Sequence, residues 1–82
     1  MRIKIRRRGE FIFKLLVFEE SSESLPSLKQ KIRNKLELDA SYNILHLVGG
    51  GRIEEMGEIM NNDEVEILNQ GIENEIKRSR EF

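Results

Sequence analysis

One amphipathic helix is the feature that most constrains how this chain can fold. Apolar residues recur at helical spacing at positions 25, 28, 32 and 36, and basic side chains lie on the opposite side. Ser24 can cap the start of the helix, and Pro26 is tolerated in the first turn because no intrahelical donor is needed there. The pattern therefore predicts a single helix over residues 24–38.

Short strand-like segments flank the helix on both sides. Residues 1–8 alternate apolar and basic side chains, and residues 11–18 follow Gly9-Glu10, a pair that suits a tight hairpin turn. Residues 44–48 and 64–68 read as two further strands after the helix. This order predicts an α+β domain in which a mixed sheet of four or five strands packs on one helix.

Composition indicates one small intracellular domain. The chain has 82 residues, of which 38% are apolar and 35% charged, and a net charge of −1. Such a balance argues against nucleic-acid or anionic-membrane binding. We expect a cytoplasmic or nuclear protein with a domain over residues 1–71, followed by a charged tail, or the start of a linker or helix, over residues 72–82. Residues 52–59 are ambiguous between a brief strand and a turn.

Several stretches of the chain resemble ubiquitin and its β-grasp relatives. The helix is similar to that of ubiquitin in spacing, Leu45-His46-Leu47-Val48-Gly49 is similar to the third strand and its glycine turn, and residues 63–68 resemble the last strand. The resemblance covers about residues 1–71. It implies a ubiquitin-like β-grasp fold with the first and last strands parallel at the centre of the sheet. Residues 51–59 look as much like doublecortin-type β-grasp domains, which bind microtubules.

Two departures from ubiquitin affect the expected function. Ubiquitin-like modifiers end in two glycines, whereas here the single Gly71 is followed by further residues, so we do not expect conjugation. The positions that correspond to ubiquitin's apolar receptor patch are Arg7, His46 and Leu68. Burying an unpaired arginine in an apolar interface is costly. Standard ubiquitin receptors are therefore not expected to bind, and these three positions are candidate contacts for another partner.

No cluster of residues predicts catalysis, a cofactor or a metal ion. His46 is the only histidine, cysteine is absent, and the serines at positions 21, 22, 24 and 27 gather at the helix start, where capping explains them. The segment Gly49-Gly50-Gly51-Arg52 lacks the Lys-Ser/Thr of a phosphate-binding loop. The acidic residues between positions 54 and 66 lack the regular spacing of a calcium loop. We expect no enzymatic activity.

A basic cluster lies on the first strand and has two interpretations. Its members are Lys4, Arg6, Arg7 and Arg8. They can form a solvated face that Glu64 and Glu66 balance from the adjacent last strand. They can also form a docking patch for an acidic partner such as tubulin.

The second strand gives the best functional indication. If Phe13, Leu15 and Val17 face the core, as the resemblance implies, then Ile12, Leu16 and Phe18 face away from the helix. An open antiparallel sheet usually has polar residues on its outer side, and this strand lies at an edge in the β-grasp order. We expect an intermolecular interface here. The alternative is that the tail around Ile72 and Ile76 covers these side chains.

These observations favour a non-catalytic, ubiquitin-like protein–protein interaction module, the N-terminal domain of a larger protein. The expected partner is a protein with an acidic surface or, through the second strand, another copy of the chain in a homodimer. The alternative is a doublecortin-like domain that binds microtubules through Arg6, Arg7 and Arg8.

Overall fold

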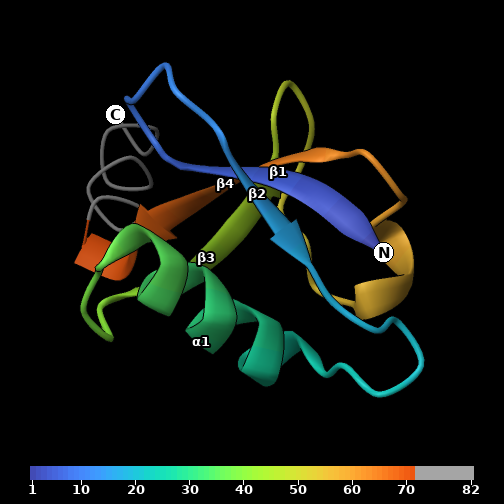
Figure 1. The fold of residues 1–82 in the computed structure, drawn as a ribbon. Helices are drawn as coiled ribbons and strands as arrows, with labels where there is room; N and C mark the ends of the chain where they lie inside the picture. Colours follow the sequence, from blue (N-terminus) through green and yellow to red (C-terminus); the bar gives the residue numbers. More distant parts are fainter. Residues whose placement is uncertain (72–82) are drawn as a thin grey trace.

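The structure is a computed structural model that describes residues 1–71. Its elements are β1 (Arg2–Arg7), β2 (Lys14–Val17), α1 (Leu25–Leu36), β3 (Tyr42–Leu47), the short 3₁₀-helix η1 (Met56–Glu58) and β4 (Glu64–Asn69). The predicted α+β class is confirmed, with a four-stranded mixed sheet packed on α1 (Figure 1). The predictions for residues 72–82, including the proposed covering role of Ile72 and Ile76, lie outside the described residues.

The strands are arranged in the order β2-β1-β4-β3. At the centre β1 and β4 run parallel, whereas β2 and β3 pair antiparallel with their neighbours. The predicted parallel pairing of the first and last strands is therefore confirmed. Because β2 and β3 are the outermost strands, each has one side without a neighbouring strand among residues 1–71.

The helix α1 begins and ends where side-chain and backbone chemistry dictate. The Ser24 hydroxyl accepts a hydrogen bond from the backbone N–H of Ser27 at 3.3 Å, and Pro26 lies in the first turn. At the other end Glu37 adopts a left-handed backbone with φ of 57°. This conformation stops the helix two residues before the predicted end at Leu38.

The core lies between α1 and the inner face of the sheet. Leu28 and Ile32 of the helix are fully buried against alternating residues of the central strands, Ile3 and Ile5 on β1 and Val65 and Ile67 on β4. The ambiguous segment 52–59 contains η1 and adds two buried isoleucines, at positions 53 and 59. The inner face is therefore fixed by β1 and β4, and it determines which side of β2 is outward.

Candidate protein-interaction surface

The structure reverses the predicted orientation of β2. Ile3 is directly opposite Leu16 in the sheet, and opposed residues of an antiparallel pair share a face. Because Ile3 is fully buried, Leu16 also lies on the inner face, where it packs against the core. Phe18 is only 5% exposed and belongs to the core itself. The expectation that Leu16 and Phe18 face away from the helix is therefore wrong.

The exposed apolar side chains of β2 are two that the resemblance predicts to face the core. Leu15 is 52% exposed and Val17 68% exposed, both on the outer face. Side chains alternate between the two faces of a strand, so an error of one residue in the predicted register moves every side chain to the opposite face. The outward apolar row that the sequence indicated thus exists, but it contains Leu15 and Val17 in place of Leu16 and Phe18.

Further apolar side chains precede β2 in its connection to β1. Phe11 is 93% exposed, and Ile12 is exposed as predicted. We call Phe11, Ile12, Leu15 and Val17 the apolar strip. Phe11 was missed as a candidate, although its place directly after the predicted Gly9-Glu10 turn was a signal for exposure.

Two arginines of the predicted basic cluster have carboxylate partners within the domain. Arg6 pairs with Glu66 on the neighbouring strand β4 at 3.2 Å, and its guanidinium lies 4.8 Å from the centre of the Phe13 ring. Arg7 pairs with Glu10 at 2.7 Å. The Arg6–Glu66 contact matches the expected balance of charge between β1 and β4, because the two residues lie opposite each other in the parallel register. Glu10, the partner of Arg7, lies instead in the connection between β1 and β2.

Lys4 and Arg8 keep exposed side chains. Lys4 lies opposite Glu64 in the register of β1 and β4, whereas Arg8 follows the end of β1, where its backbone N–H donates to the Ile67 carbonyl oxygen. Within residues 1–71 the structure shows no ion pair for either side chain. These two cations are therefore the members of the basic cluster that are best placed to meet an acidic partner.

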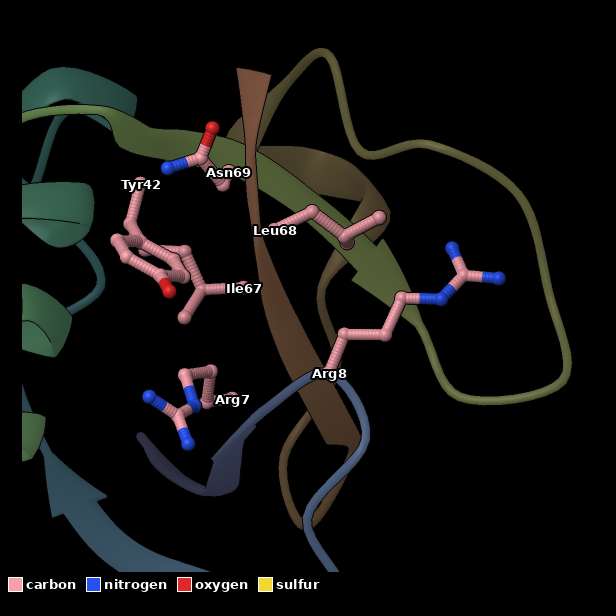
Figure 2. Close-up of a pocket in the computed structure, with 6 residues that line it drawn as sticks. All are labelled: Arg7, Arg8, Tyr42, Ile67, Leu68 and Asn69. Carbon is pink, nitrogen blue, oxygen red and sulfur yellow. The ribbon is translucent and has the colours of Figure 1, made fainter. Parts of the chain in front are cut away.

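The three positions expected to form a receptor patch do not lie together. Arg7 lies opposite Ile67, so its side chain is on the inner face of the sheet. His46 on β3 and Leu68 on β4 lie on the outer face. Leu68 is opposite Ile44 and is 1% exposed. Arg7 and Leu68 accordingly point to opposite sides of β4 in Figure 2. His46 is half-buried near the end of β3.

An open pocket of about 360 Å³ lies where β1 and β4 end and β3 begins. Its lining consists of Arg7, Arg8, Tyr42, Ile67, Leu68 and Asn69 (Figure 2). The lining offers cations, a phenol and an amide, but no carboxylate, histidine or thiol for proton transfer near neutral pH. Among residues 1–71 no group of three or more acidic, histidine or cysteine side chains is placed to hold a metal ion.

The groups with perturbed acidity lie away from the apolar strip. The ammonium of Lys31, 2.5 Å from the Glu23 carboxylate, lowers the pKa of Glu23. Hydrogen bonds from Ser41 lower the pKa of Asp39, and burial lowers the pKa of Lys29. Lys29 lies on helix α1, Glu23 precedes its start, and Asp39 lies in the turn that follows its end. The three pKa shifts therefore arise from local contacts of the helix and its two ends, and they do not mark a cluster of catalytic groups.

Comparison of the chain with protein-family models, with curated proteins and with solved structures finds no match. The resemblance to ubiquitin and doublecortin-type domains therefore stays a prediction. In the part of the chain that the structure describes, no helix is long and apolar enough to cross a membrane.

Proposed function

We propose that this chain is a non-catalytic protein-interaction domain of the ubiquitin-like β-grasp type, and that an extended segment of a partner protein binds along β2. The fold supports this proposal through its element order and its parallel central pair of strands. The observation that carries it is the apolar strip, because exposed apolar side chains lie on an edge strand that is open to further pairing.

Strand addition explains why both features occur in the same place. An extended peptide that joins a sheet edge gains main-chain hydrogen bonds, and contacts with alternate side chains give specificity. On β2 the alternate outward side chains are Leu15 and Val17. Phe11 and Ile12 extend the apolar surface beyond the start of the strand. An extended partner segment with apolar residues at alternate positions fits this arrangement.

A selection from a displayed peptide library tests the proposal. We expect enrichment of extended apolar sequences whose binding is lost in Val17→Lys and retained in Met60→Lys. Met60 is the matched control because it is also an exposed apolar residue but lies outside β2. Failure to enrich any peptide, or equal binding by wild type and Val17→Lys, would contradict the proposal.

The second candidate function is microtubule binding in the doublecortin manner. The exposed cations Lys4 and Arg8 favour it, because they are available to the acidic surface of tubulin. Co-sedimentation with microtubules at two salt concentrations is the test, since a charge-driven complex weakens as salt rises. The double variant Lys4→Glu/Arg8→Glu should remain in the supernatant. Sedimentation of that variant to the same extent as wild type would exclude a role for these cations.

A further inference from the structure

Alternate residues of β2 direct their backbone groups toward the open edge of the sheet. Phe18 exchanges hydrogen bonds with Met1, at 2.9 Å from its N–H and 2.6 Å to its carbonyl oxygen. Residues that exchange such bonds alternate along an antiparallel pair with residues that do not. Leu16 and Lys14 therefore bond toward β1, whereas Leu15 and Val17 present their N–H and C=O groups to the edge.

The phase of β1 agrees with this assignment. The backbone N–H of Lys4 donates to Asp63, on the β4 side, at 2.9 Å. Its neighbours Ile3 and Ile5 consequently direct their groups toward β2, where they lie opposite Leu16 and Lys14. On β2, the residues with edge-directed backbone groups are thus also the residues with exposed apolar side chains.

We propose that the partner at this edge is a second copy of the chain, paired antiparallel through β2 about a two-fold axis at Leu16. In this register Leu15 lies opposite the partner's Val17, and Val17 opposite the partner's Leu15. Both pairs join residues whose backbone groups face the edge, so four main-chain hydrogen bonds form between the strands. This inference rests on the proposed interaction role of β2 and names the partner.

Other two-fold registers are less complementary. Moving the axis to Val17 sets Leu15 opposite the partner's Glu19, which faces an apolar side chain with a charged one. Moving it to Leu15 sets Val17 opposite the partner's Phe13, which lies outside β2 and whose ring already contacts the Arg6 guanidinium. The axis at Leu16 is therefore the register in which both outward apolar residues of β2 pair with outward apolar residues of the partner's β2.

Charge is also complementary in this arrangement. Lys14 is exposed at the start of β2, and the exposed Glu19 and Glu20 follow its end. Antiparallel pairing about Leu16 sets Lys14 opposite the partner's Phe18, so each lysine lies near the acidic residues that directly follow Phe18 in the other copy. On the outer face, Lys4 and the partner's Arg2 are separated by three strand spacings, about 14 Å. Because that distance exceeds the Debye length of roughly 8 Å at physiological salt, their repulsion is largely screened.

The size of the interface sets the expected affinity. Pairing two four-residue strands and their flanking apolar side chains buries less than about 1,200 Å², the range of transient complexes. We therefore expect a dissociation constant between about 10 μM and 1 mM. Sedimentation equilibrium over this range should show a monomer–dimer equilibrium for wild type and for Met60→Lys. Val17→Lys should be monomeric, with its circular dichroism spectrum unchanged.

Mixed cysteine variants test the register itself, because the natural chain contains no cysteine. Leu15→Cys and Val17→Cys, mixed in equal amounts under mild oxidation, should form the mixed disulfide well beyond the twofold excess over each homodisulfide that random pairing gives. The random 1:2:1 ratio of the three products, or an excess of either homodisulfide, would overturn the axis at Leu16. A wild type that stays monomeric at 1 mM, or a dimer that persists in Val17→Lys, would overturn pairing through β2. Monomeric behaviour with peptide binding retained would leave the proposed function standing.

Discussion

Alanine substitution at two adjacent residues, Phe18 and Val17, tests the facing of β2 directly. Phe18 is part of the core, whereas Val17 is largely exposed. Removing a buried phenylalanine side chain reduces stability by about 3–5 kcal/mol. Because exposed residues follow Phe18 directly and can relax into the space, we expect the lower end, about 3 kcal/mol. The exposed Val17→Ala change should alter stability by less than about 0.5 kcal/mol.

The effect is large relative to the whole domain. About 70 ordered residues correspond to a total stability of roughly 4–10 kcal/mol. At about 4–8 °C per kcal/mol, Phe18→Ala should lower the melting temperature by roughly 12–24 °C. Thermal and urea unfolding followed by circular dichroism at about 5 μM measures both variants below the concentration at which dimers are expected. A loss under about 1 kcal/mol for Phe18→Ala, or equal losses in the two variants, would refute the assigned facing.

Four further substitutions probe other contacts by urea unfolding. Glu37→Gly should raise stability by about 0.5–1 kcal/mol, because glycine relieves the left-handed backbone at φ 57°, and a loss would contradict this. Ser24→Ala should lower it by about 1 kcal/mol through loss of the helix cap, whereas no change would exclude that cap's contribution. Arg6→Glu should lower it by about 1–2 kcal/mol and Arg8→Glu by less than about 0.5, and the reverse order would contradict the ion-pair assignment. The pKa of Glu23 is lowered in the folded state, so its stabilisation is present above the ordinary value of 4.5 and is lost as pH falls below it. Wild type should therefore lose more stability than Glu23→Gln between pH 6 and pH 3, and parallel pH profiles would contradict this.

The helix could be predicted because its signals are local. The apolar spacing from Leu25 to Leu36, the cap at Ser24 and the proline in the first turn all act within one or two turns, and each is present in the structure. The end of the helix was placed two residues too late. Glutamate is not a residue that usually adopts a left-handed backbone, so the sequence carries no signal for the stop at Glu37.

The site was harder to predict because its accessibility depends on contacts between distant parts of the chain. Alternation on the first strand identified a basic face correctly, but which cations are neutralised depends on Glu66, sixty residues away from Arg6. The burial of Leu68 depends in the same way on Ile44, which lies opposite it on β3. Neither side chain's exposure follows from its own segment.

For β2, the resemblance to ubiquitin and the predicted hairpin turn imply opposite inner faces, and the structure agrees with the turn. Residues 11–18 are apolar at every position except Lys14, so the segment has no alternation from which its inner face can be read. The resemblance to ubiquitin predicts the opposite phase, with Leu15 and Val17 facing the core. Yet a two-residue turn at Gly9-Glu10 predicts Leu16 opposite Ile3, which is the observed register, although the turn itself lies at Arg8-Gly9, where the Glu10 N–H donates to the Arg7 carbonyl oxygen. Since Ile3 is an inner residue, the turn alone implied that Leu16 and Phe18 face the core.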